Sequence, residues 1–197
     1  MTPDTFLALL AFAFVSSVTP GPNNLMLLAS GVNFGLRRTV PHMIGIAGGF
    51  CVLLLAVGFG LGALLTAVPA LHTALKIAGG AYLLYLAWKI AMSRGISDRE
   101  AGERPMRFLE AAAFQWVNPK AWVMAVTAMA IYTDADHPFA SVVLVALAFT
   151  LVNLPSVSVW AGFGVVLRQF LADPVRLKWF NVAMGVLLAL TLIPLLR

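Results

Sequence analysis

Six long apolar stretches, separated by short polar loops, dominate the pattern of this chain. A helix that spans a bilayer needs about 20 mostly apolar residues, and each stretch meets or approaches that length. The pattern therefore predicts an all-α membrane protein with six transmembrane helices. Their approximate limits are residues 6–30, 40–65, 70–92, 108–132, 139–167 and 177–196.

The first and the fourth stretch are each interrupted by proline and polar residues. The interrupting residues are Pro20, Gly21, Pro22, Asn23 and Asn24 in the first stretch and Asn118, Pro119 and Lys120 in the fourth. Proline removes a backbone donor and clashes with the preceding turn. Lipid cannot satisfy the freed backbone groups, so a broken helix survives only where protein or a water-filled cavity receives it. Paired interruptions at corresponding positions of two halves indicate the binding site of a transporter.

The longest polar stretch, residues 93–107, divides the chain into two parts with three predicted spans each. Because an odd number of crossings turns the second part over, we predict two inverted three-helix repeats with broken first and fourth helices. The repeats are expected at 1–92 and 108–197, joined by a cytoplasmic linker. Little other sequence identity relates the halves, so the prediction depends on the breaks and the span count.

Composition supports a membrane protein and argues against other classes. The chain has 197 residues, of which 61% are hydrophobic and 11% charged, whereas soluble domains average about 25% charged residues. Its net charge of +5 is dispersed over short loops and forms no nucleic-acid-binding motif. The single cysteine, Cys51, can form no intramolecular disulfide and belongs to no metal-binding motif. We therefore expect no cofactor, no metal and no nucleic-acid partner; the expected partner is the lipid bilayer.

The basic residues predict an orientation, because cytoplasmic loops of membrane proteins carry an excess of Lys and Arg. With six spans, the basic loops all fall on one side, and both termini are then periplasmic. Residues 1–5 lack the positive charge of a cleaved signal peptide, so the first stretch is expected to remain. The basic residues concerned are Arg37, Arg38, Lys89, Arg94, Arg99, Arg104, Arg107, Arg168, Arg176 and Lys178.

The interruptions predict a site for a zwitterion. A half-helix that starts after a break presents free N–H groups and a partial positive charge, which suit a carboxylate. Lys120 adds a full positive charge, unless its side chain extends to the membrane interface instead. The half-helix before a break ends in free carbonyls, which suit an ammonium. We therefore predict that the eight interrupting residues bind an amino acid, together with Asn153, whose alternative role is a hydrogen bond between helices.

These motifs resemble those of the LysE/RhtB family of amino-acid exporters. Three motifs of this chain resemble the N-terminal signature of that family: Thr-Pro-Gly-Pro-Asn-Asn (19–24), Gly-Leu-Arg-Arg (35–38) and Gly-Ile-Ala-Gly-Gly (45–49). Residues 79–89 resemble the family's third segment, and Asn-Pro-Lys (118–120) its fourth-segment motif. The branch that includes exporters of cysteine and O-acetylserine is the most similar. The resemblance implies a bacterial inner-membrane protein that expels amino acids with the help of the proton gradient.

The apolar interiors hold essentially no acidic residue, which favours small neutral substrates such as cysteine, O-acetylserine, homoserine or threonine. Proton coupling would then involve Glu110, Lys120 or an indirect route. No catalytic motif indicates an enzyme, but a passive channel or a lipid-handling protein stays an alternative. Gly45 and Gly49 indicate close helix packing, and glycine-bearing faces are compatible with a homodimer.

Overall fold

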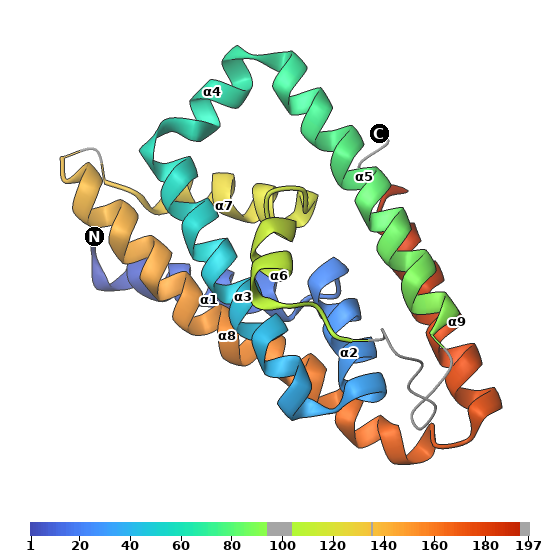
Figure 1. The fold of residues 1–197 in the computed structure, drawn as a ribbon. Helices are drawn as coiled ribbons and strands as arrows, with labels where there is room; N and C mark the ends of the chain where they lie inside the picture. The colour runs from blue at the N-terminus through green and yellow to red at the C-terminus, as the bar shows by residue number, and fades with distance from the viewer. Residues whose placement is uncertain (94–103, 135, 194–197) are drawn as a thin grey trace.

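The protein is helical throughout the residues that the structure, a computed structural model, describes: 1–93, 104–134 and 136–193. This confirms the predicted all-α class, and Figure 1 shows the arrangement. The elements are α1 (Pro3–Val18), α2 (Pro22–Phe34), α3 (Leu36–Ala56), the π-helical turn η1 (Val57–Leu61), α4 (Gly62–Ala67), α5 (Pro69–Met92), α6 (Phe108–Phe114), α7 (Pro119–Tyr132), α8 (Pro138–Phe170) and α9 (Pro174–Leu190).

The first apolar stretch is broken where its prolines predict. α1 ends at Val18, α2 begins at Pro22, and the two helices are bent by 55°. Pro22 occupies the first turn of α2, where its missing N–H would have no partner in any case. The break thus follows from local backbone chemistry.

The fourth stretch is broken in a similar way. α6 ends at Phe114, and α7 begins at Pro119 after a short turn. The side chain of Asn118 accepts a hydrogen bond of 3.2 Å from the backbone N–H of Lys120, so it caps the start of α7. Asn118 is thus the N-cap of α7, and Pro119 is its first helical residue.

Among the residues that the structure describes, two helical stretches are long and apolar enough to cross a membrane: Leu36–Leu61 and Pro138–Phe170, with 26 and 33 residues. The bent pair of α1 and α2 makes a third if both halves cross as one span. α7 and α9, with 14 and 17 residues, are shorter than the roughly 20 that a full span needs. The six spans, the inverted repeats and their limits therefore stay predictions, and most of the predicted linker (94–103) lies outside the described residues.

The two predicted halves pack across each other. α1 and α2 lie against α8, α6 lies against α3, and α5 runs beside α9 (Figure 1). Helices of each half therefore contact helices of the other half. This crossed packing brings the two breaks into the same region of the molecule.

Gly45 and Gly49 confirm the predicted close packing of helices, here between α3 and α6. A Cβ atom on Gly45 would lie 2.4 Å from the carbonyl oxygen of Phe108. One on Gly49 would lie 2.4 Å from the Cα atom of Ala112. Real Cβ atoms do not approach backbone so closely, so these glycines allow α6 to lie directly on α3.

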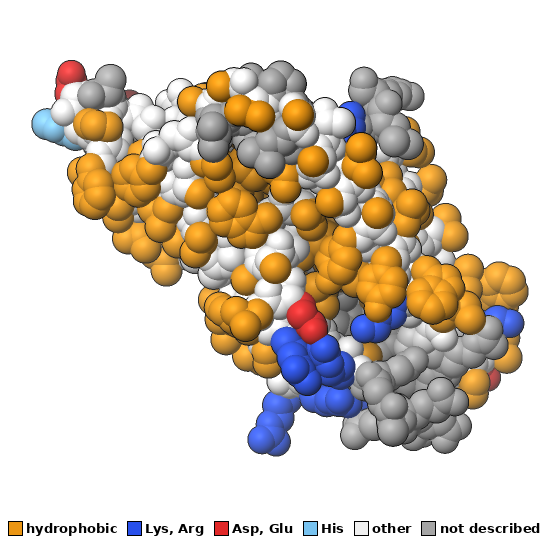
Figure 2. Space-filling view, turned by 45° about the horizontal axis from the view of Figure 1, so that its top comes forward, with side chains coloured by type: hydrophobic (Ala, Val, Ile, Leu, Met, Phe, Trp, Pro, Cys, Tyr) orange, Lys and Arg blue, Asp and Glu red, His pale blue; other side chains and the backbone are white. Residues whose placement is uncertain are grey.

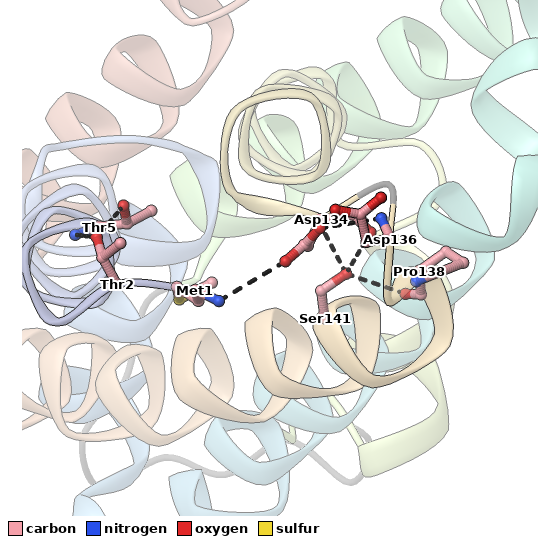
Figure 3. A network of polar contacts seen from close by, with 7 residues as sticks. All are labelled: Met1, Thr2, Thr5, Asp134, Asp136, Pro138 and Ser141. Atoms are coloured by element: carbon pink, nitrogen blue, oxygen red, sulfur yellow. Dashed lines mark hydrogen bonds and ion pairs between the residues drawn. The ribbon is translucent and has the colours of Figure 1, made fainter.

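Basic and acidic loops lie at different ends of the molecule. Lys and Arg side chains gather in the lower part of Figure 2, where α2, α5 and α8 end. The loop between α7 and α8 lies at the other end, beside the N-terminus (Figure 3). There the N–H of Asp134 donates to the Ser141 hydroxyl at 2.9 Å, and the Asp134 carboxylate lies 3.7 Å from the amino group of Met1. This separation agrees with the charge pattern used above, but the orientation in the membrane stays a prediction.

Candidate substrate site at the two helix breaks

The two breaks meet at one pocket, which has a volume of about 320 Å³ including its open side. Helices α1, α2, α3, α7 and α8 contribute to it, together with residues of both breaks. Its lining consists of polar side chains over an apolar base: Ser16, Ser17, Gly21, Asn23, Asn24, Phe50, Gln115, Asn118, Lys120, Ala121, Met124, Asn153 and Val157.

Six of the nine residues predicted to bind substrate line this pocket. They are Gly21, Asn23, Asn24, Asn118, Lys120 and Asn153. Pro20, Pro22 and Pro119 do not line it; they interrupt the helices and start the new ones. The sequence thus located the region, and the prolines act on the backbone and not on the pocket surface.

The side chain of Lys120 reaches the end of α1. Its ammonium donates a hydrogen bond to the carbonyl of Thr19 and lies 3.5 Å from the carbonyl oxygen of Pro20. The backbone at Gly21 leaves the necessary room, because a Cβ atom there would lie 2.7 Å from Cδ of Lys120. The free carbonyls that the sequence assigned to a substrate ammonium are therefore contacted by the protein's own ammonium.

The other carbonyls at the end of α1 also have side-chain partners. Nδ2 of Asn24 donates to the carbonyls of Ser17 and Thr19, at 2.9 and 2.8 Å. Nε1 of Trp160 donates to the carbonyl of Val18 at 3.1 Å. The carbonyls of Ser17, Val18 and Thr19 thus have protein partners, as expected for a break inside a membrane span.

Asn23 and Gln115 join the two breaks directly. Nδ2 of Asn23 donates to Oε1 of Gln115 at 2.8 Å, and Nε2 of Gln115 donates back to Oδ1 of Asn23 at 3.2 Å. Gln115 is fully buried, and it was not among the residues predicted to bind substrate. A polar side chain inside an apolar stretch, three positions before Asn118, was the signal that could have identified it.

Asn153 of α8 makes the interhelical hydrogen bond that was the alternative role offered by its sequence position, and its role in substrate binding stays a prediction. Its Nδ2 donates to the hydroxyl of Ser17 at 3.0 Å, which is a hydrogen bond between helices. Its Oδ1 is buried and has no hydrogen-bond partner within the described part of the chain. Since buried polar atoms are nearly always paired, this oxygen is available to accept a hydrogen bond from a ligand.

The charge of the pocket comes from Lys120, because the lining residues given above include no other charged side chain. Glu110, near the start of the fourth stretch, does not line the pocket. Its carboxylate accepts a hydrogen bond of 2.8 Å from Arg104 and one of 2.9 Å from the N–H of Arg107. Glu110 thus holds the start of α6, and the pocket presents one positive charge beside neutral amides and hydroxyls.

Comparison with known proteins gives the family. The family model described as LysE type translocator matches residues 14–196. The cysteine/O-acetylserine efflux protein of Escherichia coli (strain K12) is 35% identical over 133 residues, which cover 67% of each chain. The protein of that name from Salmonella typhimurium (strain LT2) is 33% identical over 132 residues, again 67% of each chain. No solved structure matches. The resemblance of the motifs is thereby confirmed, and this chain belongs to the LysE family of membrane translocators.

Proposed function

We propose that this protein exports small neutral amino acids or their derivatives across the bacterial inner membrane, coupled to the proton gradient. Cysteine, O-acetylserine, homoserine and threonine are the substrate types that we favour. The observation that carries the proposal is the pocket where both breaks meet, with Lys120 and the unpaired oxygen of Asn153 in its wall. The names of the relatives support the same substrate class.

The polar groups of the pocket match the two ends of an amino acid. The ammonium of Lys120 can bind the substrate carboxylate in a charge-assisted hydrogen bond. Oδ1 of Asn153 can accept a hydrogen bond from the substrate ammonium, which would satisfy a buried polar atom that has no partner among the described residues. An amino acid bound in this way would lie between α7 and α8.

The same wall favours a neutral side chain. The lining residues that the structure describes include no Asp or Glu. A lysine or arginine substrate would bring a second positive charge into a pocket that already contains Lys120, and a buried charge without a partner is costly. A short side chain can instead contact Phe50, Met124 and Val157.

Transport requires the pocket to open on each side in turn. The Asn23–Gln115 pair and the hydrogen bond from Lys120 to Thr19 hold the two breaks together. A substrate carboxylate that draws Lys120 away from Thr19 weakens one of these links. We propose that this exchange of partners couples binding to movement of the half-helices around the pocket.

We place proton coupling on Lys120 and not on Glu110. Lys120 lies in the pocket wall, whereas the Glu110 carboxylate is bound by Arg104 at the start of α6. A lysine surrounded by protein can change its protonation state more readily than one in water. Loss of its proton would weaken its hydrogen bond to the carbonyl of Thr19 and would remove the positive charge that pairs with the substrate carboxylate.

The purified protein in proteoliposomes tests the function. Vesicles loaded with radiolabelled cysteine under reducing conditions are expected to release it faster with an imposed pH gradient, and a protonophore should abolish the difference. An efflux rate that is the same with and without the pH gradient would support the passive channel. Movement of fluorescent phospholipid without amino-acid efflux would support the lipid-handling alternative.

Asn153→Leu is expected to slow export about tenfold or more, because the acceptor for the substrate ammonium is lost. The measurement is cysteine efflux per amount of protein in the membrane. Thr150→Val is the matched control on α8: its hydroxyl bonds to the carbonyl of Ala146 in its own helix, and it does not line the pocket. Equal efflux from both variants would remove Asn153 from the site.

A further inference from the structure

A second pocket lies between α2, α3, α5 and the residues that lead into α6. It has a volume of about 590 Å³ including its open side, and it lies toward the end of the molecule where the basic residues gather. Apolar side chains of α2 and α5 form much of its wall. Its polar wall contains His42, Lys89 and Arg104. None of these residues contributes to the pocket at the breaks.

His42 is the unusual member of this wall. Its side chain is 2% exposed, and neither ring nitrogen has a hydrogen-bond partner among the residues that the structure describes. A neutral imidazole carries one donor and one acceptor, and leaving both unpaired in a buried position is costly. Unpaired ring nitrogens in the wall of a pocket indicate that a ligand supplies the missing hydrogen-bond partners.

Lys89 and Arg104 give the pocket its charge. Arg104 is paired with Glu110, and this hydrogen bond raises the pKa of Arg104, so Arg104 stays cationic. Lys89 forms no ion pair with any described acidic residue. An anion entering the pocket therefore meets one cation that is already paired and one that is available.

The two pockets lie in series along α2. The first turn of α2 contributes Asn23 and Asn24 to the pocket at the breaks, and its last turn contributes Asn33 to the second pocket. α2 has 13 residues, which corresponds to a length of about 20 Å. A small solute that enters from the basic end would therefore reach the second pocket before the breaks.

We infer that the second pocket is a loading site on the cytoplasmic side, where Lys89 and His42 bind the carboxylate of the exported amino acid before it moves to the breaks. The inference depends on the proposed function and adds to it a separate position for the substrate. The carboxylate accepts from Lys89 and from the imidazole N–H of His42, and the substrate side chain contacts the apolar wall.

Binding stoichiometry of the full-length protein tests this loading site. Equilibrium dialysis with radiolabelled cysteine, under reducing conditions, is expected to give two molecules per chain for the wild type and one for Lys120→Met. Adding Lys89→Met to Lys120→Met should weaken the remaining binding about tenfold or more, the loss expected when a charged partner is removed. His42→Gln in the same background should weaken it as well.

Controls separate this inference from the proposed function. Lys89 is exposed, so Lys89→Met leaves the core intact even if His42→Gln folds poorly. Lys76→Met, earlier on α5 and outside both pockets, is the matched control. A wild type that neither transports nor binds cysteine would refute the proposed function. If the wild type transports cysteine but the Lys120→Met variant binds none, the loading site alone is refuted. Displacement of the residual cysteine from Lys120→Met by phosphatidylglycerol would also refute it.

Discussion

Lys120→Met is expected to reduce amino-acid export to background, by on the order of 100-fold, while the protein stays in the membrane. The change removes the ammonium that we assign to the substrate carboxylate, and a hydrogen bond to a charged group contributes about 1.5–3 kcal/mol. It also frees the carbonyl of Thr19, which then lacks this donor at the break. Efflux from loaded proteoliposomes, divided by the amount of protein, measures the effect.

Lys178→Met on α9 serves as the control, because Lys178 is exposed and lies outside both pockets. It should export at the wild-type rate. Unchanged export by Lys120→Met would contradict the site. Loss of the variant from the membrane would instead show that Lys120 mainly holds α7 to the end of α1.

Gly164→Ala is expected to have the largest effect on stability, about 3 kcal/mol, at the upper end of the usual range for overpacking. α2 and α8 are in backbone contact at this residue. A Cβ atom on Gly164 would lie 2.2 Å from the carbonyl oxygen of Leu28 and 3.0 Å from Cα of Gly31. Both are backbone atoms and cannot rotate away, so the two helices must separate. Thermal unfolding in detergent and the amount of folded protein in membranes measure the loss.

Gly162→Ala provides a matched control two positions earlier on α8. A Cβ atom there would meet nothing within 4 Å, and alanine favours a helix more than glycine does, so this variant should be at least as stable as the wild type. If Gly164→Ala were as stable as Gly162→Ala, α2 and α8 could not be packed as closely as described. The comparison therefore tests the packing that holds the first break in place.

Two buried side chains of the described residues, Asn153 and His42, keep polar atoms without a hydrogen-bond partner. Each unpaired buried acceptor or donor costs about 1–3 kcal/mol. Asn153 belongs to the pocket at the breaks and His42 to the second pocket. This agrees with two positions for substrate along α2.

Local chemistry made the two breaks predictable, but not every proline has the same consequence. Pro41 and Pro155 lie inside the continuous helices α3 and α8. The two breaks differ because proline there is accompanied by a cap, Gly21 or Asn118, that lets a new helix begin. A single proline without such a cap is accommodated within a helix.

The partners across the site were not predictable in the same way. Asn23 and Gln115 are 92 positions apart, and Lys120 reaches a carbonyl 101 positions earlier. Nothing in the local sequence specifies these pairs, because they depend on how α6 and α7 lie beside α1 and α2. The predicted carboxylate role of Lys120 therefore omitted the contact that its ammonium makes with α1.

Local sequence accounts for the helical class, the position of both breaks and the candidate residues around them. These follow from hydrophobic length and from the backbone limits of proline and its caps, which act within a few residues. The packing of the helices specifies which carbonyls Lys120 contacts, which amides pair across the breaks and where buried polar atoms lack a partner. It also placed a second pocket at the far end of α2. These features arise from contacts between helices that are distant in the chain, and glycine positions such as Gly164 set how closely those helices approach.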